Sequence, residues 1–569
     1  MESKVVVINH GSHSLKIGLA SDISPRIIPN FIARRRKTKT SVQNNNSNSN
    51  GLPSSNTIDK GLVMTQLESV KNAIRDYQAT QQPIGNKIKI PTNNIVYNEL
   101  NSMSNEKKKK KPISYVGSST TPLEPLKYSE IDYCIGDDAL EVSRDQENWI
   151  CYQPISMGTF NVSREHSLRS LCDELVEMWK YAITRYLGIP SSDLSIYGCV
   201  YVVPDFYDRR ELKEITSMIL KQLPFTSMLL YQESVCHTFG ASMSTQCVLV
   251  DIGHDKIQIS CVDEGYLHQN SRITLKYGSN TQRKLLEYLL VNKSEIQKYY
   301  FPTNIFPDQQ NGQTQKVPYY IKVFESLKHE YLNFQFENMK QQKVSLFKVQ
   351  DPKNEKMLNI YRFNVEELYQ LVAMSIFFPQ LLLEFQKNQQ TLLSQQQLTQ
   401  DYEEIIEESS LLSQQDFPIL NNSGFIKQQQ QQQQQQSDRY SHLALDTAIY
   451  RSVMILLNER IDTKKKYMNN ILVVGGGSQV AGFTDILKYR LQQTIENTVA
   501  PPTSTTTTIL LSSDVGYYQN IRTDIDPTLM AWKGGAIIGC LESSKEIWIT
   551  RNEYKNGENT SILRDKLPF

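Results

Sequence analysis

Three segments of the 569-residue sequence combine an apolar run with a turn of small or polar residues. The apolar runs are residues 5–8, 248–250 and 471–474, and the turns that follow them are residues 9–12, 251–253 and 475–478. Glycine and serine in such turns let the backbone approach a phosphate group closely and donate N–H groups to it. One such turn is common in α/β proteins, but three of them favour two related halves that face a shared phosphate-binding cleft.

Strands and helices must position these turns. The three apolar runs show no polar alternation, which is typical of strands buried on both faces of a sheet. Residues 168–187, 209–220 and 281–290 carry apolar side chains at helical spacing. The alternation of such strands and helices predicts an α/β fold.

The composition excludes several classes of protein. Lys and Arg total 61 and Asp and Glu total 60, so a net charge of +1 gives no global attraction to nucleic acid. Eight cysteines form no CxxC pair, which favours a reducing compartment, the cytosol or the nucleus. We expect no signal peptide and no transmembrane helix, because no apolar run approaches about 18 residues.

Two polar regions predict disordered insertions, because neither can bury enough apolar surface to offset chain entropy. The first covers residues 38 to about 127 and contains five lysines, Lys107 to Lys111. The second covers residues 386 to about 437 and contains nine consecutive glutamines at 428–436. The polar composition of residues 501–508 predicts a short surface loop. The lysine run leaves three interpretations open: a nuclear-import signal, a DNA contact, or solvated loop charge.

Seven blocks, in the same order and across nearly the whole chain, resemble the actin family. They are residues 8–12 with 16–18, 136–139, 152–155, 230–234, 250–253, 532–536 and 548–554. The resemblance implies an α/β, actin-like ATPase-domain fold, in which two related α/β lobes with four subdomains surround a central nucleotide cleft. It divides the chain into subdomain 1 (1–33, 152–241, 533–569), subdomain 2 (34–151), subdomain 3 (242–277, 438–532) and subdomain 4 (278–437).

The resemblance also implies a site for ATP, or for ADP, with Mg²⁺. In that site Asp251 keeps a carboxylate for the hard cation, and Gln232 keeps the glutamine that orients the attacking water. No metal ligand follows from the protein alone, although Asp251 could act through a water. The positions that match the family's nucleotide-binding residues are Gly11, Ser12, Lys16, Gln232, Asp251, Gly253, Gly475, Gly476, Gly477 and Ser478.

Five positions depart from the actin pattern. Actins have aspartates where this chain has Asn9 and His254, and a histidine where it has Gln258. An amide brings no charge, and an imidazole cannot replace a carboxylate toward Mg²⁺. Asp255 and His13 stand where actins have glycines. We therefore expect no catalytic residues and little or no hydrolysis, and three states of the site stay open: nucleotide bound without turnover, a nearly empty site, and a working ATPase.

Residues 26–36 and 473–478 are similar to a nuclear subgroup of the family that belongs to the INO-eighty chromatin-remodelling complex. That likeness implies a non-catalytic architectural subunit in the nucleus, with roles in transcription regulation and DNA repair and recombination. Its partners would be a helix of the remodeller's motor subunit, actin and other actin-related proteins. The helix would lie in a groove near the segment after Pro204 and near Ile538 and Leu541.

Two other functions compete with this hypothesis. The first is an active, actin-like ATPase with a cytoskeletal or polymerising role, against which the pair Asn9 and His254 argues. The second is a DNA-binding module that acts through Lys107 to Lys111 on nucleosomal or linker DNA, and it can coexist with the architectural role. A metal site at His10 and His13 is a further alternative, although an actin-like loop explains both histidines without a metal.

Overall fold

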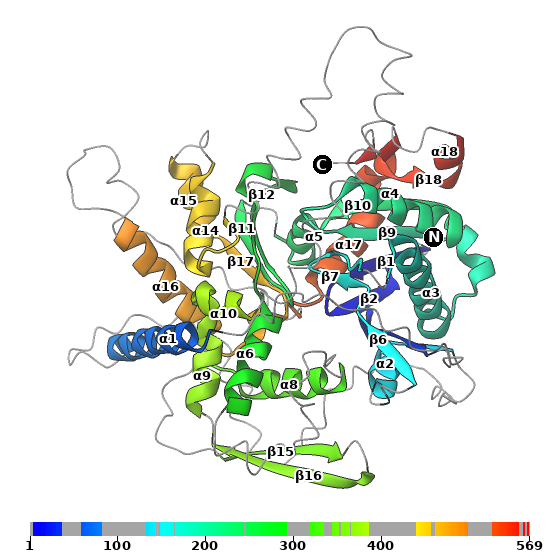
Figure 1. The fold of residues 1–569 in the computed structure, drawn as a ribbon. Coiled ribbons are helices and arrows are strands. Elements are labelled where there is room, and N and C mark those ends of the chain that lie inside the picture. The colour runs from blue at the N-terminus through cyan, green and yellow to red at the C-terminus, as the bar shows by residue number, and fades with distance from the viewer. Residues whose placement is uncertain are drawn as a thin grey trace, which may run out of the picture.

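A computed structural model shows two α/β lobes side by side (Figure 1). The structure describes residues 4–36, 59–81, 132–292, 318–385, 440–498 and 526–567, apart from short gaps at 144, 146–147, 164–165, 244–245, 335–343, 352–353, 365, 457–460, 557–561 and 564–565. The first lobe contains both ends of the chain, and most of the second lobe comes from its middle. The predicted α/β, actin-like fold with two related lobes is confirmed.

The sheet of the first lobe has the strand order β18-β10-β9-β1-β2-β3. Strands β1, β9 and β10 are parallel, whereas β2, β3 and β18 are antiparallel to their neighbours. All six residues of β1 and of β9 are buried, as the absence of polar alternation predicts. The strands are β1 (Val5–His10), β2 (Ser14–Leu19), β3 (Arg26–Pro29), β9 (Gly198–Val203), β10 (Ser227–Gln232) and β18 (Ile549–Thr550).

Helix α3 (Leu168–Leu187) covers one face of this sheet and has the bounds that its apolar spacing predicts. The Ser167 side chain accepts a hydrogen bond from the Ser170 N–H at the N-terminus, and Gly188 ends the helix with φ 68°. Helix α4 (Arg209–Ser217) runs into a π-helical turn at Met218–Gln222, so the pair spans the second predicted helix. Helix α18 (Arg551–Asn556) follows β18.

A smaller unit extends the first lobe. It consists of β4 (Ile32–Arg35), β5 (Tyr133–Ile135), α2 (Asp137–Val142) and β6 (Trp149–Tyr152), with β4 at the centre of its sheet. The short hairpin of β7 (Ile155–Ser156) and β8 (Thr159–Phe160) follows it. The two residues between these strands, Met157 and Gly158, both have positive φ, as a tight two-residue hairpin turn requires.

The second lobe repeats the design with the strand order β13-β12-β11-β17, and β14 pairs with β12. Strands β11 and β17 are parallel, so the second and third apolar runs lie side by side. The strands are β11 (Cys247–Ile252), β12 (Ile257–Asp263), β13 (Tyr266–Leu267), β14 (Ile273–Leu275), β17 (Ile471–Val474) and the separate pair β15 (Val344–Asp351) and β16 (Asn354–Asn364). The helices are α6 (Ser279–Asn292), α8 (Pro318–Tyr331), α9 (Glu366–Met374), α10 (Pro379–Glu384), α14 (Leu445–Met454), α15 (Ile461–Asn469) and α16 (Phe483–Thr498).

Two short helices, α5 (Glu233–Gly240) and α17 (Met530–Cys540), pack closely between the lobes (Figure 1). A Cβ on Gly534 would lie 1.6 Å from the Cys236 carbonyl oxygen, and one on Gly240 would lie 2.1 Å from that of Met530. Only glycine allows this approach of the two backbones. Ile538 on α17 is 2% exposed in the core, so it cannot line a groove for a partner helix, whereas Leu541 is 37% exposed.

The predicted disorder of residues 38 to about 127 is wrong for residues 60–81. They form helix α1 (Lys60–Gln81), which packs on α9 and α10 of the second lobe. Its buried side chains, Val63, Leu67, Val70, Ile74 and Tyr77, recur every three or four residues and join the core of that lobe. The rest of the first insertion, including Lys107 to Lys111, lies outside the described residues, as do residues 386–437 and 501–508.

Among the described residues, no helix is both long enough and apolar enough to span a membrane. The division into four subdomains stays a prediction, except that α1 shows part of residues 34–151 packed on the other lobe.

The packing of α1 is testable with two matched truncations. We expect Leu67→Ala to lower the free energy of unfolding by about 2–5 kcal/mol, because it deletes a side chain that is 7% exposed in the core. Met64→Ala, on the same helix but 68% exposed, should change it by less than about 0.5 kcal/mol. Chemical denaturation followed by circular dichroism measures both, and equal effects would contradict the placement of α1.

Candidate functional site

A cavity of about 330 Å³ lies between the lobes, within the range of about 300–1,000 Å³ typical of small-molecule sites. The three turns singled out in the sequence all line it. The predicted site residues in its wall are Asn9, Gly11, Ser12, His13, Lys16, Asp251, Gly253, His254, Asp255, Gln258, Gly475, Gly476 and Gly477. Gln232 and Ser478 are not among the lining residues.

Two different physical reasons explain why the third turn contains glycines. Gly475 has φ +84°, and a Cβ there would lie 2.3 Å from the Asp251 carboxylate; a Cβ on Gly477 would lie 2.2 Å from the Ile252 side chain. Packing against β11 therefore requires glycine at both positions. At Gly476 the nearest atom to a Cβ would be 3.9 Å away, so this glycine leaves open space that faces the cavity.

The first turn is held by a buried chain of hydrogen bonds. The Trp179 indole donates to His10 Nδ1 (3.1 Å), so the His10 Nε2–H donates to Asn30 Oδ1 (3.0 Å). The Asn30 amide in turn donates to the backbone carbonyl of Ser12 (2.9 Å). Burial lowers the pKa of His10 to about 4, so the ring is neutral at pH 7. Both of its nitrogens are engaged, which leaves His10 structural rather than a metal ligand.

Charged groups lie deep in the cavity wall. Burial lowers the pKa of the Lys16 ammonium group. The nearby carboxylates of Glu233, Asp251 and Asp526 act in the opposite direction and raise it. Burial raises the pKa of Asp251 to about 6 and that of Glu233 to about 8, and Asp251 adds to the shift of Glu233. The two carboxyl groups thus share a poorly solvated place, where Lys16 and Lys256 offset part of the cost of their negative charge.

His254 replaces a carboxylate with a neutral ring. Burial is the largest cause that lowers its pKa. The ring lies against His13, with 4.7 Å between centroids and the two ring planes tilted by 42°, and its Nδ1 lies 3.9 Å from Glu325 Oε1. Burial alone would raise the pKa of Glu325, but Lys328 and then His254 lower it to about 2. This corner of the cavity is therefore balanced by the protein's own charges.

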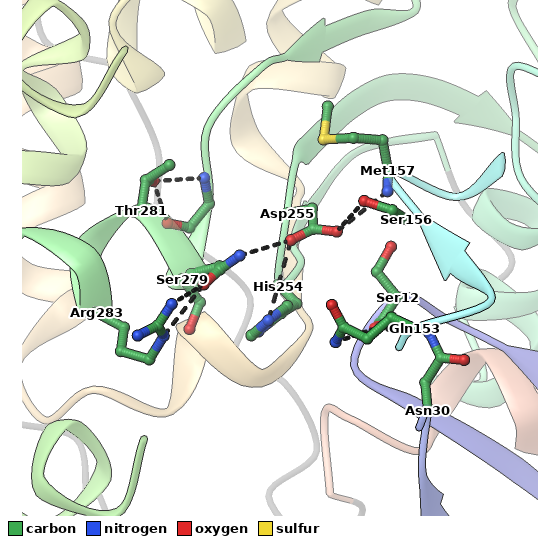
Figure 2. A network of polar contacts seen from close by, with 12 residues as sticks. Ser12, Asn30, Gln153, Ser156, Met157, His254, Asp255, Ser279, Thr281 and Arg283 are labelled. Atoms are coloured by element: carbon green, nitrogen blue, oxygen red, sulfur yellow. Dashed lines mark hydrogen bonds and ion pairs between the residues drawn. The ribbon is translucent and has the colours of Figure 1, made fainter. Parts of the chain in front are cut away.

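Asp255 ties the two lobes together (Figure 2). From the turn after β11 it accepts hydrogen bonds from the Met157 N–H (3.1 Å) and the Ser156 hydroxyl (3.2 Å) of the β7–β8 hairpin in the first lobe. Its other oxygen accepts from the Asn280 amide in the second lobe (3.0 Å). Burial alone would raise the pKa of Asp255, but His254 and the bonds from Met157 and Asn280 hold it below its usual value.

The same hairpin is also bonded to the first phosphate-type turn. The Gly158 N–H donates to the Ser12 hydroxyl (3.1 Å), so Ser12 is engaged by the protein rather than turned freely into the cavity. On the other side, Asn280 accepts two hydrogen bonds from the Arg283 guanidinium, at 3.1 and 2.8 Å. We name this connected set, Ser12, Ser156, Met157, Gly158, Asp255, Asn280 and Arg283, the interlobe clamp.

Two further predicted site residues are buried but do not belong to the interlobe clamp. Asn9 is 3% exposed and Gln258 is 4% exposed. The amide nitrogen of Gln258 has no hydrogen-bond partner among the described residues. Its position, where actins have a histidine, therefore offers a donor toward the cavity but no proton-transfer group.

Several cavity residues were missed by the sequence analysis. Glu325 and Lys328 come from α8, and nothing in the local pattern connects them with the three turns. The spacing of Glu233 and His237 could have identified them, because a Glu and a His four residues apart share one face of a helix.

Two lobes of the same strand–turn design around one cavity define a class of two-lobed α/β proteins. A family model described as Actin matches residues 1–566, and the chain belongs to the actin family. Actin-related protein 8 of Dictyostelium discoideum is 32% identical over an alignment 882 positions long, gaps included, which covers 100% of both chains. Actin-related protein 8 of Bos taurus is 26% identical, over 99% of this chain and 92% of the bovine protein.

A solved structure, titled as human actin-related protein Arp8 in its ATP-bound state, is similar in fold. Its TM-score is 0.67 at 24% identity, over 100% of this chain and 97% of the human one. The resemblance to the actin family is confirmed, and so is the special likeness to the actin-related protein 8 subgroup.

The interlobe clamp predicts a specific change in amide exchange. Asp255→Gly removes the acceptor, so we expect the Met157 amide to exchange its hydrogen at least about 10-fold faster, equivalent to about 1.4 kcal/mol of lost protection. Because the pKa of Asp255 is lowered, the clamp is present at neutral pH and is lost only as the pH falls through that lowered value.

Hydrogen-exchange mass spectrometry of the hairpin peptide measures this effect. Ser156→Ala is the matched control, because it removes one hydroxyl and keeps the backbone bond from Met157. Unchanged exchange in Asp255→Gly would show that the clamp does not hold the lobes.

Proposed function

We propose that the chain is a non-catalytic architectural subunit of a nuclear, INO-eighty-type chromatin-remodelling complex, and that it binds ATP with little or no hydrolysis. The observation that carries the proposal is the contrast within one cavity. The glycine turns and Lys16 that suit phosphate binding are in place, but the two positions where actins have further aspartates hold Asn9 and His254.

Nucleotide binding is supported by the shape and chemistry of the cavity wall. Gly476 leaves space at the third turn, and Lys16 supplies a positive charge near the first. The human relative whose fold this chain shares is described as ATP-bound, which supports the same ligand here. If Mg²⁺ accompanies ATP, Asp251 is the one carboxylate of the actin pattern left to orient it, so the residues present fit that ion poorly.

Loss of turnover follows from what the remaining groups can do. Hydrolysis needs a cation held at the phosphates and a water placed for in-line attack. His254 is held near Glu325 and Asp255, and it brings no negative charge. Gln232 does not line the cavity, so the glutamine expected to orient water is not in contact with it. Each positioned acid–base group is typically worth about 10²–10⁴ in rate.

The architectural part of the proposal is supported by the likeness to actin-related protein 8 over the full chain. An amphipathic helix of the motor subunit would bind at the end of the first lobe, where Leu541 is partly exposed. Actin and other actin-related proteins would lie alongside, in the nucleus. Contact with nucleosomal or linker DNA through Lys107 to Lys111 is a separate proposal, and those residues lie outside the described ones.

Turnover can be tested by restoring the two charges. The unmodified protein should release phosphate from ATP no faster than Gly476→Val, a variant that fills the space at the third turn. Asn9→Asp combined with His254→Asp should raise the rate by about 10²-fold or more, because it restores two positioned carboxylates. Thermal melting must first show that the double variant folds. A rate in the unmodified protein equal to that of conventional actin would overturn the proposal.

Assembly can be tested by affinity purification from nuclear extract. We expect the tagged protein to recover a remodelling motor, actin and other actin-related proteins. Gly476→Val should recover the same set, because Leu541, at the proposed helix contact, does not line the cavity. Recovery of cytoskeletal filaments without any remodeller subunit would contradict the architectural role.

A further inference from the structure

Lys256 extends its ammonium group from one lobe to the other along the wall of the cavity. The residue lies in the turn between β11 and β12 of the second lobe, and it lines the cavity. A Cβ on Gly158, in the β7–β8 hairpin of the first lobe, would lie 2.6 Å from Lys256 Nζ and 3.1 Å from its Cε. The ammonium group can lie there because Gly158 has no side chain. It therefore lies beside the hairpin turn whose N–H groups bond to Asp255 and Ser12.

The Lys256 ammonium group lacks a partner within the part of the chain that the structure describes. No hydrogen bond and no ion pair among those residues engages it, and the same holds for Lys16 of the first lobe. Lys328, a third lysine of the wall, pairs with Glu325 at 2.5 Å and donates to the Ser279 carbonyl (3.1 Å). A poorly solvated ammonium group without a partner is costly. Two such groups on opposite lobes indicate that the cavity takes an anion.

The carboxyl groups near Lys256 do not cancel its charge. Two of them, Glu233 and Asp251, line the cavity, and Lys256 lowers the pKa of both. Burial has the larger effect and raises the pKa of Glu233 to about 8, so this group is mostly protonated at pH 7. Lys256 also lowers the pKa of Asp205 and Glu211, and burial again outweighs it. The wall around Lys256 therefore retains positive charge at neutral pH.

We propose that Lys256, with Lys16, takes the place of a divalent cation toward the phosphates, so that this chain binds ATP without Mg²⁺. An ammonium group brings a positive charge and three hydrogen-bond donors to phosphate oxygens. Mg²⁺ is held mainly by carboxylate oxygens, and Asn9 and His254 supply none. Lys256 would also repel an ion of charge +2 at the same phosphates. The inference rests on the proposed binding of ATP and names the groups that neutralise its charge.

The test measures the Kd of the full chain for a fluorescent ATP analogue, once in excess EDTA and once in excess Mg²⁺. We expect equal Kd values under the two conditions, because the lysines need no metal. Lys256→Met keeps the apolar stem and removes the charge. It should weaken binding in EDTA at least about 10-fold, the lower end for a hydrogen bond to a charged group. Mg²⁺ should restore part of this loss, because Lys256 no longer repels the ion.

Two further variants serve as controls. Lys256→Arg keeps a positive charge at the same position, so it should still bind the analogue in EDTA. Lys466→Met removes an exposed lysine of α15 that does not line the cavity, and it should leave both Kd values unchanged. Thermal melting of each variant shows whether it folds as the unmodified protein does.

Two results would overturn the role of Lys256 while leaving the proposed binding of ATP intact. They are binding by the unmodified protein that requires Mg²⁺, and binding by Lys256→Met in EDTA as tight as that of the unmodified protein. Absence of binding under both conditions would instead overturn the proposed function, and this inference with it. The comparison of EDTA with Mg²⁺ uses the unmodified protein, so it decides the question even if a variant misfolds.

Discussion

The contact on which the cleft depends is the carboxylate of Asp255 between the two lobes. It accepts hydrogen bonds from the β7–β8 hairpin on one side and from Asn280 on the other, and it is 5% exposed. The hairpin also bonds to Ser12 through Gly158. A connection made by the protein's own groups holds the lobes together without a ligand. Such a connection favours a protein whose lobes stay fixed over one whose lobes open and close with each nucleotide.

The charges of the cavity bear on our proposal that this actin fold binds nucleotide without hydrolysing it. The backbone of the turns is fixed by packing, since Gly475 and Gly477 are pressed against β11. The side chains that would take part in hydrolysis are not fixed in this way, so they can be substituted without loss of the fold. His254 among Glu325, Lys328 and Asp255 forms a balanced buried cluster. Glu233 and Asp251 lie beside Lys16 in the same wall, and burial raises the pKa of both carboxyl groups.

The sequence predicted the parts of this protein that depend on local pattern. The strand–turn segments, helix α3 and the cavity-lining glycines have short-range signatures, and the structure brings those segments to one cleft. Helix α1 was missed because the polar composition of its surroundings outweighed its apolar stripe, which becomes visible against α9 and α10. The partners of Asp255 and the approach of His237 to Asp251 join residues distant in sequence. No spacing rule along the chain encodes such contacts.

The central claim, ATP held without turnover, is tested most directly by the nucleotide that the protein carries. The protein should be purified from nuclei through gel filtration without added nucleotide, denatured, and its released nucleotide identified by chromatography. The account predicts ATP at close to one molecule per chain, because in our proposal the cavity binds the nucleotide without the groups needed to cleave it. Recovery of ADP would contradict the loss of turnover, and recovery of no nucleotide would contradict binding.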